Sequence, residues 1–410
     1  MMTQSSFRFA VAAATVLAVG AAAADVDLSK IVKGKERGVF GLYGDTPDAT
    51  HAWSVHDLNR PYPVQVETPE GKPPSDAVVL FDGTQRSVDE NWCAPDGSPT
   101  KWYVKDGCFV CAPKSGMACT KRPFDDAQFH VEWMSPVEDA KKYGQLAGNS
   151  GVFPMGMHEI QILNSYDPDP KADVKRNYPD GIAGSTYAEN PPMVNASRPA
   201  GQWQSYDIVF HQPIWEGDRM VYPGSITVFH NGVLVQDHWE LEGLTTHRTR
   251  KPLKPYATKL PWKLQDPGDP VPLRNIWIRE IPSRTANTTH GGPYARQADV
   301  KALREKVAAA LSALVDTNAC DAKNVNGALE VLAYSKKTAY CCAAARLCGA
   351  YEARIKAMDA AAQKAAREEI VGTIQSLCVL IRNNVIAADT YPLFATLDAI
   401  CKANKWSYRK

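Results

Sequence analysis

A glutamate and a glutamine alternate with isoleucines in the segment His158-Glu159-Ile160-Gln161-Ile162-Leu163. Side chains on a β-strand point alternately to opposite faces, so Ile160 and Ile162 would face the core while Glu159 and Gln161 share the other face. A carboxylate can remove a proton from a bound substrate, and a neighbouring amide can orient that substrate. We therefore predict Glu159 as a catalytic candidate and Gln161 as a substrate-binding residue. His158, on the core side, is predicted to be structural.

A second alternating segment, Gln128-Phe129-His130-Val131-Glu132-Trp133, predicts another strand with its apolar residues buried. His130 and Glu132 would then project outward. If the outward faces of both segments belong to one concave sheet, a carboxylate, an amide and an imidazole meet there. His130 is then a catalytic candidate, and Glu132 is a substrate-binding candidate. The alternative is that the acidic side chains belong to a solvated or ion-paired strand face.

Small polar residues and aromatic residues supply further candidates for binding a sugar. Asn149 and Ser150 precede Gly151 at the predicted start of a strand, where glycine permits close approach of the backbone to a ligand. The rings of Tyr187 and Trp203 are candidates for stacking on the apolar face of a pyranose, with packing inside the domain as the alternative.

The spacing of acidic residues argues against an ordinary glycosidase. Retaining glycosidases place a nucleophile and an acid about 5 Å apart. Sandwich-fold glucanases typically carry Glu-x-Asp-x-x-Glu on one strand, whereas this segment has Glu159, Gln161 and Asn164 at those places. Only the first of the three is ionisable, so the chemistry is expected to depend on a single carboxylate.

These residues belong to a strand-rich region that we place at residues 76–284. Turn-forming residues separate its short alternating segments, and the strongest strand predictions are 128–133, 157–163, 205–210, 225–230 and 274–279. Asn231-Gly232 is typical of a two-residue hairpin turn, because both residues adopt the left-handed torsions that such a turn requires. Many short strands without intervening helices predict a mainly β sandwich or jelly roll.

Taken in order, the motifs of this region resemble the 3-keto-disaccharide hydrolase family, which has a concanavalin A-like lectin/glucanase fold. They are Leu80-Phe81-Asp82-Gly83, Trp102-x-Val104-x-Asp106-Gly107, Asn149-Ser150-Gly151-Val152-Phe153, the segment 158–163, Gly184-x-x-Tyr187, Gly201-Gln202-Trp203, Asn231-Gly232, Leu264-Gln265-Asp266 and Arg274-Asn275-Ile276-x-Ile278-Arg279. The resemblance spans about residues 76–284. One departure is Gln265-Asp266-Pro267-Gly268, where the family commonly has histidine in place of the proline.

The resemblance implies an enzyme that cleaves 3-keto-glycosides. A ketone at C3 acidifies the proton on C2, so one general base, Glu159, can remove it while the C1 substituent leaves, and water then adds. His130, Asn149 or a divalent metal would stabilise the enolate; no other cofactor is predicted. The chain has no dinucleotide-binding glycine fingerprint, so a separate oxidoreductase would make the ketone. The alternatives are a non-catalytic glycan-binding module, or an adaptor whose helical domain binds a protein partner.

Two segments of different character flank the strand-rich region. Residues 25–75, rich in Pro, Gly and Asp, predict an extended arm lying on the following domain. After a linker at 285–295, residues 296–410 predict a helical bundle with helices near 296–315, 323–334, 338–356, 359–384 and 389–402. Asp321 and the pair Asp389-Thr390 are the predicted helix caps.

The amino terminus predicts export to the periplasm or medium. Arg8 precedes an apolar run that ends in Ala22-Ala23-Ala24, typical of a signal peptide over residues 1–24, with a membrane anchor as the alternative. No later segment is apolar enough to span a bilayer. The formal net charge of +1 leaves no excess positive charge that would attract a nucleic acid, so no nucleic-acid partner is predicted.

Export gives the ten cysteines a predicted role in disulfides within each domain. Four lie in the strand-rich region, Cys93, Cys108, Cys111 and Cys119, and six in the helical region, Cys320, Cys341, Cys342, Cys348, Cys378 and Cys401. A zinc knuckle at Cys108-x-x-Cys111 is disfavoured, because side chains three apart on a strand point to opposite faces.

Overall fold

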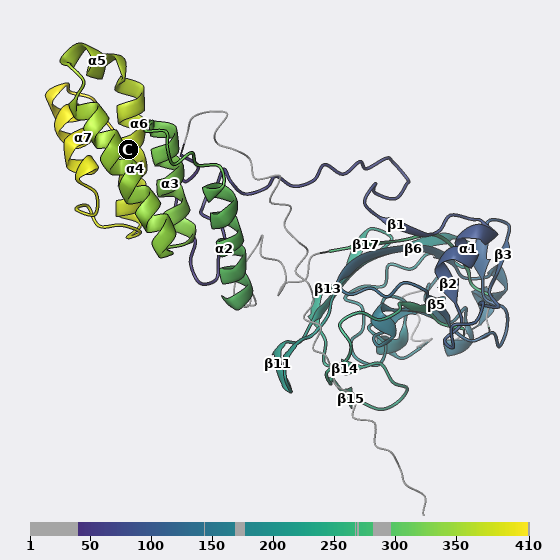
Figure 1. Cartoon of the computed structure of the whole chain (residues 1–410). Helices are drawn as coiled ribbons and strands as arrows, with labels where there is room; N and C mark the ends of the chain where they lie inside the picture. Colours follow the sequence, from purple (N-terminus) through teal and green to yellow (C-terminus); the bar gives the residue numbers. More distant parts are fainter. Residues whose placement is uncertain are drawn as a thin grey trace, which may run out of the picture.

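A computed structural model describes residues 40–142, 144–168, 177–266, 268, 270–281 and 297–408. The predicted signal peptide at 1–24, the predicted linker at 285–295 and Pro267 lie outside these residues. Two antiparallel sheets come first along the chain and six helices follow from residue 297 (Figure 1). The predicted fold class, a β sandwich followed by helices, is confirmed.

The larger sheet has eight strands, all antiparallel to their neighbours. Seven follow one another across the sheet in the order β13 (Val233–Glu240), β12 (Ser225–His230), β9 (Trp203–His211), β6 (Ala127–Met134), β17 (Pro272–Glu280), β4 (Cys108–Val110) and β3 (Tyr103–Lys105), while β1 (Val78–Phe81) also pairs with β17. Four of these strands, β6, β9, β12 and β17, are the ones that alternation predicts most strongly.

The smaller sheet has five short strands, in the order β2 (Trp92–Cys93), β5 (Ala118–Thr120), β16 (Lys263–Leu264), β7 (Ser150–Phe153) and β8 (Ile160–Ile162). The strand predicted at 157–163 is therefore shorter than expected, because a 3-10 turn at Pro154–Gly156 precedes it. Two separate hairpins are β10 (Ile214–Glu216) with β11 (Arg219–Tyr222), and β14 (Gly243–Leu244) with β15 (Lys251–Pro252).

The two sheets enclose one apolar core. Phe129, Val131 and Trp133 of β6 are all buried in it, which confirms the predicted alternation. Ile160 and Ile162 of β8 enter the same core from the smaller sheet. Burying each large side chain contributes roughly 1.5 to 3 kcal/mol, so alternation fixes which face of each strand turns inward.

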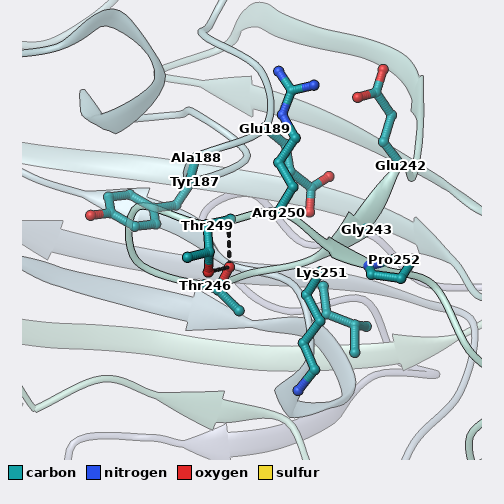
Figure 2. A pocket seen from close by; sticks show the side chains of 11 residues that line it. Tyr187, Ala188, Glu189, Glu242, Gly243, Thr246, Thr249, Arg250, Lys251 and Pro252 are labelled. Atoms are coloured by element: carbon teal, nitrogen blue, oxygen red, sulfur yellow. Dashed lines mark hydrogen bonds between the residues drawn. The ribbon is translucent and has the colours of Figure 1, made fainter.

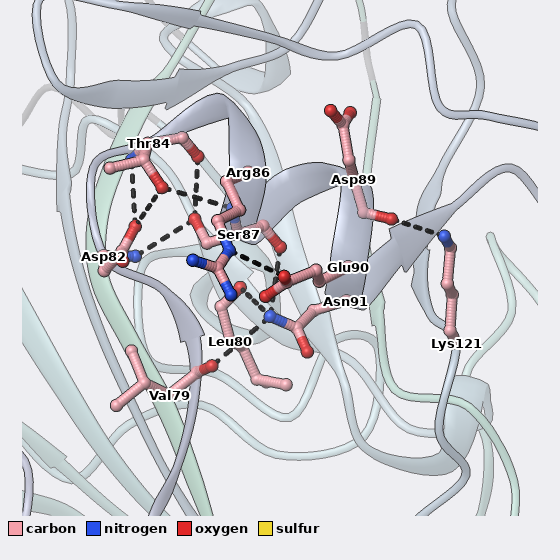
Figure 3. A network of polar contacts seen from close by, with 10 residues as sticks. All are labelled: Val79, Leu80, Asp82, Thr84, Arg86, Ser87, Asp89, Glu90, Asn91 and Lys121. Carbon is pink, nitrogen blue, oxygen red and sulfur yellow. Dashed lines mark hydrogen bonds and ion pairs between the residues drawn. The ribbon is translucent and has the colours of Figure 1, made fainter.

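Polar contacts hold the turn after β1 (Figure 3). Asp82 Oδ1 accepts hydrogen bonds from the N–H and the hydroxyl of Thr84, at 3.0 and 2.6 Å. Thr84 in turn caps α1 (Gln85–Asn91) by accepting from the N–H of Ser87. Gly83 has a φ of 97°, which an L-residue adopts only with strain. The motif Leu80-Phe81-Asp82-Gly83 is therefore a structural turn.

The hairpin between β12 and β13 turns at Asn231 and Gly232, whose φ values are 52° and 79°. His230 pairs directly with Val233 across this turn. Positive φ at both central residues is what a type I′ turn requires, so the prediction from Asn-Gly is confirmed.

The helical region contains α2 (Gln297–Ser312), α3 (Ala322–Tyr334), α4 (Thr338–Lys356), α5 (Ala360–Ala365), α6 (Arg367–Arg382) and α7 (Pro392–Ala403). The helix predicted at 359–384 is divided at Ala366. Asp321 caps α3 as predicted, accepting from the N–H of Asn324. The cap predicted at Asp389-Thr390 is wrong, because α7 begins at Pro392, whose fixed φ suits the first helical turn.

The segment from Phe40 to Asn59 packs on the helices, so the predicted contact of this arm with the sandwich is wrong. Phe40, Leu42 and Trp53 belong to the same apolar core as the helices. In Figure 1 the start of the described chain, in purple, runs beside the helices. An apolar residue in the sequence shows that a partner is needed but does not identify it.

Buried hydrogen bonds fasten the arm to α3. The Tyr334 hydroxyl donates to Asp57 Oδ2, and the Asn59 amide donates to Glu330 Oε1. The N–H groups of Ser54 and Asn59 also donate to the Asp57 carboxylate, at 3.0 and 2.9 Å. Burial raises the pKa of Asp57, although these hydrogen bonds oppose the rise. The Asp57 carboxylate can therefore remain buried only while these donors are in place.

The described residues contain no disulfide, and all ten cysteines lie among them. The predicted pairing stays a prediction. No helix in the described ranges is both long and apolar enough to cross a bilayer.

We expect Tyr334→Phe to destabilise the helical region by about 1 to 3 kcal/mol, because the buried Asp57 carboxylate loses a donor. Urea unfolding followed by far-ultraviolet circular dichroism measures this change. Tyr391→Phe is the control, because it removes a tyrosine hydroxyl elsewhere in the same core. Equal effects of the two substitutions would show that the arm is not held by this network.

Candidate active site

The predicted site residues divide between two faces of the sandwich. His130 and Glu132 lie on β6 and point away from the core, because Phe129, Val131 and Trp133 fill it. The segment that includes Glu159 and Gln161 belongs to the smaller sheet on the other side of that core. The predicted meeting of carboxylate, amide and imidazole is therefore wrong. Alternation assigns a face within one strand but does not say which sheet the strand joins.

On the outer face of the larger sheet the predicted residues satisfy one another. Glu132 accepts from Arg274 Nε at 2.6 Å and from Asn275 Nδ2 at 2.9 Å. Burial raises the pKa of Glu132, but these hydrogen bonds outweigh it and hold the pKa below its usual range. The Arg274 guanidinium lies 3.9 Å from the centre of the Trp203 ring, which covers the predicted stacking surface. His130 Nδ1 lies 2.8 Å from Asp207 Oδ1. This face fits the ion-paired alternative.

Glu159 directly precedes β8 and is only 4% exposed. Its N–H donates to Thr245 Oγ1 at 2.8 Å, and its C=O accepts from the Tyr187 N–H at 2.9 Å. The side chain lies over Gly151, where a Cβ would be 2.6 Å from Glu159 Oε1. Burial raises the pKa of Glu159 to about 8. The carboxyl is therefore protonated near neutral pH and becomes a base above it.

Gln161 shares the face of Glu159 but is 1% exposed. Its Nε2 donates to Asn149 Oδ1 at 2.9 Å and to the carbonyls of Ser150 and Ile162 at 2.9 and 2.7 Å. The Ser150 hydroxyl is buried as well and donates to the Gln265 carbonyl at 2.9 Å. Gln161 and Ser150 thus hold the local structure, and Asn149, which is half-buried, is the member of this group nearest to solvent.

Tyr187 uses its hydroxyl within the protein, in addition to any stacking by its ring. The oxygen lies 2.7 Å from the Tyr178 hydroxyl and 2.9 Å from His247 Nδ1. The rings of Tyr187 and His247 are nearly parallel, at 10° with centroids 6.5 Å apart. His247 is exposed to solvent. Sequence reasoning missed His247, because it lies on no predicted strand and in no recognised motif.

A pocket of about 270 Å³ lies beside Tyr187, against β14 and β15 (Figure 2). Tyr187 stands on one side of it and Glu242 on the other, with Thr246, Thr249 and Arg250 between them. The mixture of hydroxyls, charged groups and an aromatic ring suits a saccharide, and the volume is near the lower end of ligand pockets, which run from about 300 Å³ upward.

Glu189 also lines this pocket and was not predicted. Both carboxyl oxygens are sealed from solvent and have no hydrogen-bond partner among the described residues. Burial raises the pKa of Glu189 to about 7, and the Glu242 carboxylate adds to the rise. The backbone N–H of Glu242 lies near the Glu189 carboxyl and lowers its pKa in part, but it does not form a hydrogen bond with it. Only the fold shows that this acidic residue lies beside the pocket.

The remaining candidates have structural surroundings. His158 is buried, as predicted, and burial lowers its pKa to about 3. Within the described ranges, no three His, Cys, Asp or Glu side chains are grouped so that they could hold a metal ion.

Comparison with known proteins assigns the sandwich to a described family of domains. The sequence profile of the 3-keto-alpha-glucoside-1,2-lyase-like domain matches residues 76–279. A solved structure of a Parabacteroides distasonis protein, provisionally assigned as a glycosyl hydrolase, is 34% identical, with a TM-score of 0.48 over 56% of this chain and 98% of that one. A second such protein of that organism is 18% identical, with a TM-score of 0.35 over 50% and 94%. No functionally curated protein matches the chain.

The buried carboxyl of Glu159 predicts a stability that falls with pH. Because its pKa is about 8 in the folded protein and about 4.5 when unfolded, its favourable contribution is complete below pH 4.5 and is lost as the pH rises through 8. We expect Glu159→Gln to raise the unfolding free energy relative to wild type at pH 8, by roughly 4 kcal/mol more than at pH 4.5.

Urea unfolding followed by tryptophan fluorescence measures this difference, since all the tryptophans except Trp53 and Trp406 lie in the sandwich region. Glu132→Gln is the matched control with the opposite sign, because the pKa of Glu132 is lowered and its contribution is present above its unfolded pKa. A pH-independent effect of Glu159→Gln would contradict the assignment.

Proposed function

Because the chain belongs, through residues 76–279, to the 3-keto-alpha-glucoside-1,2-lyase-like domain family, we propose that it is a carbohydrate-active enzyme that cleaves 3-keto-glycosides by elimination. The match agrees with the family indicated by the sequence motifs. The observation that carries the proposal is the desolvated carboxyl of Glu159, whose backbone contacts Tyr187 in the wall of a saccharide-sized pocket.

The chemistry needs one base at the reacting carbon. The Glu159 carboxylate takes the proton from C2, the electron pair of that bond forms the C1–C2 double bond, and the bond between C1 and the leaving oxygen breaks with its electrons on the oxygen. The ketone at C3 makes the C2 proton acidic by accepting charge on its oxygen. Water then adds across the double bond and restores a free 3-keto sugar.

Asn149 is the residue best placed to contact the sugar near this base. It is held by Gln161, which shares the face of Glu159 two residues along the chain. Gln161 is therefore a positioning residue in the proposal. His130 has no part in it, because it lies on the outer face of the other sheet.

Access to Glu159 requires movement of the segment from Gly243 to Pro252. Thr245 and Tyr187 contact Glu159 through the backbone, and the pocket wall contains Tyr187 but not Glu159. Because β14 and β15 are only two residues long, few backbone hydrogen bonds oppose their displacement. We propose that substrate binding displaces this segment and brings the C2 proton to the carboxylate.

We expect Glu159→Gln to lower release of free sugar from a 3-keto-disaccharide by about 10²- to 10⁴-fold, because the amide cannot take the proton. The wild-type kcat/KM should rise with pH to a plateau above about pH 8, since the base must be ionised. Glu132→Gln, on the opposite face, should leave turnover near the wild-type rate.

Undiminished turnover by Glu159→Gln would contradict the role of this residue. Saturable binding of the unoxidised disaccharide by the wild type, without turnover of the 3-keto form, would instead identify a glycan-binding module.

We also propose that the protein is exported and that Cys93 and Cys119 form a disulfide. The two residues are paired directly across β2 and β5, and Cys93 Sγ lies 3.6 Å from the Cys119 carbonyl oxygen. Directly opposed residues on antiparallel strands have Cα atoms about 4.5 to 5.5 Å apart, within the range that a disulfide requires. Cys108 and Cys111 are less suited to each other, because Cys108 is half-exposed at β4 while Cys111 lies in the core.

Treatment with oxidised glutathione should join Cys93 to Cys119, as the two thiols give two electrons and two protons to the oxidant. Peptide mapping of protein recovered from outside the cytoplasm should find the same link, and the bond should add roughly 3 to 4 kcal/mol of stability. Cys108→Ser is the control that should leave the link intact. Unmodified Cys93 in exported protein would contradict the proposal.

A further inference from the structure

We propose that Tyr187 is the general acid that protonates the leaving oxygen, and that His247 supplies the replacement proton from solvent. The inference rests on the proposed elimination and adds its second proton-transfer group. It assigns to the Tyr187–His247 pair a task that no sequence motif indicated.

The placement of Tyr187 joins the pocket to the proposed base. Its side chain forms one wall of the pocket (Figure 2), and its backbone N–H donates to the carbonyl of Glu159 at 2.9 Å. The Tyr187 phenol is also close enough to feel the Glu159 carboxyl electrostatically. Tyr187 thus contacts both the pocket, through its ring, and the backbone of the proposed base. The proposal places the leaving oxygen on C1 beside the Tyr187 hydroxyl.

The two neighbours of the phenol can leave its own proton free for a ligand. A phenol oxygen accepts hydrogen bonds as well as donating one. When the Tyr178 hydroxyl and His247 Nδ1–H both donate to the Tyr187 oxygen, at 2.7 and 2.9 Å, the Tyr187 proton has neither of them as acceptor. The same two donors would stabilise the phenolate that forms when this proton leaves.

The phenol keeps its proton until the reaction needs it. Burial raises the pKa of Tyr187, and the nearby Glu159 charge raises it further. An acid of this kind does not ionise at neutral pH in the resting site. It gives up its proton when a strongly basic alkoxide is forming at its oxygen.

The proton transfers balance within these groups. Glu159 takes the proton from C2, the C1–O bond breaks, and the leaving oxygen takes the Tyr187 proton. His247 then returns a proton from Nδ1 to the phenolate and receives one at Nε2 from solvent, to which it is exposed. In the hydration step Glu159 returns its proton to C2 while the water oxygen bonds to C1. The water releases one proton to solvent, which balances the proton that His247 took up. Proton exchange with solvent then returns His247 to the Nδ1–H tautomer.

The leaving group provides a direct test. A departing 4-nitrophenolate is stable without protonation, whereas a departing sugar alkoxide needs a proton. We expect Tyr187→Phe to lower kcat on a 3-keto-disaccharide by about 10²- to 10³-fold, but to change kcat on 4-nitrophenyl 3-keto-glucoside by less than about tenfold. Retained turnover of the nitrophenyl substrate also shows that the variant is folded.

Tyr256→Phe is the matched control. Tyr256 also has its hydroxyl near a histidine nitrogen, 3.3 Å from His158 Nε2, but that histidine is buried and neither residue lines the pocket. The ratio of the two substrates' kcat values should stay at the wild-type ratio in this variant. If Tyr187→Phe does not fold, His247→Gln gives the same test, with selective loss on the disaccharide expected again.

The outcomes separate the two proposals. If the wild type cleaves both substrates and Tyr187→Phe slows both by the same factor, or neither, then Tyr187 is not the acid and the proposed function stands. If the wild type cleaves neither substrate, the proposed function is wrong and the role of Tyr187 falls with it.

Discussion

The candidate site depends on one constraint, the burial of the Glu159 carboxyl on the face of the smaller sheet that is turned away from the core. The side chain can lie over the neighbouring strand only because residue 151 is glycine. Burial in turn raises the pKa to about 8, so the folded protein carries an acidic group that is destabilising once it ionises. Groups buried at such a cost are frequent at functional sites, where the shifted pKa is part of the chemistry.

Contacts with neighbouring segments hold the backbone of Glu159 in place. Thr245, next to β14, accepts a hydrogen bond from the Glu159 N–H, and the Tyr187 N–H donates to the Glu159 carbonyl. On the same face the Gln161 amide donates a hydrogen bond to Asn149 and so fixes its position. The Glu159 carboxyl is buried near this short hairpin, and the Tyr187 hydroxyl contacts the solvent-exposed His247.

The two faces of the sandwich differ in how their polar groups are satisfied. On the larger sheet, the Glu132 carboxylate accepts hydrogen bonds from Arg274 and Asn275. These contacts neutralise its charge and occupy the groups that a ligand would need. Near the smaller sheet, burial raises the pKa values of Glu159, which directly precedes β8, and of Glu189, which lies outside the strands. Ion pairs and hydrogen bonds compensate the charges on the larger sheet, whereas the buried carboxyls near the smaller sheet destabilise the fold once they ionise. The helical region, with its own core and the arm fastened to Tyr334, is built independently of this contrast.

The sequence by itself determined the features that depend on neighbours along the chain. Alternation placed Phe129 and Trp133 inward, Asn231-Gly232 predicted its turn, and Asp321 predicted the start of α3, because each depends on backbone geometry over a few residues. The tertiary structure alone decided which sheet each strand joins, and with it the separation of His130 from Glu159. It also decided that the arm packs on the helices and that His247 and Glu189 lie beside Tyr187 and the pocket. These are contacts between segments distant in sequence, and local periodicity carries no information about which distant partner a buried face will meet.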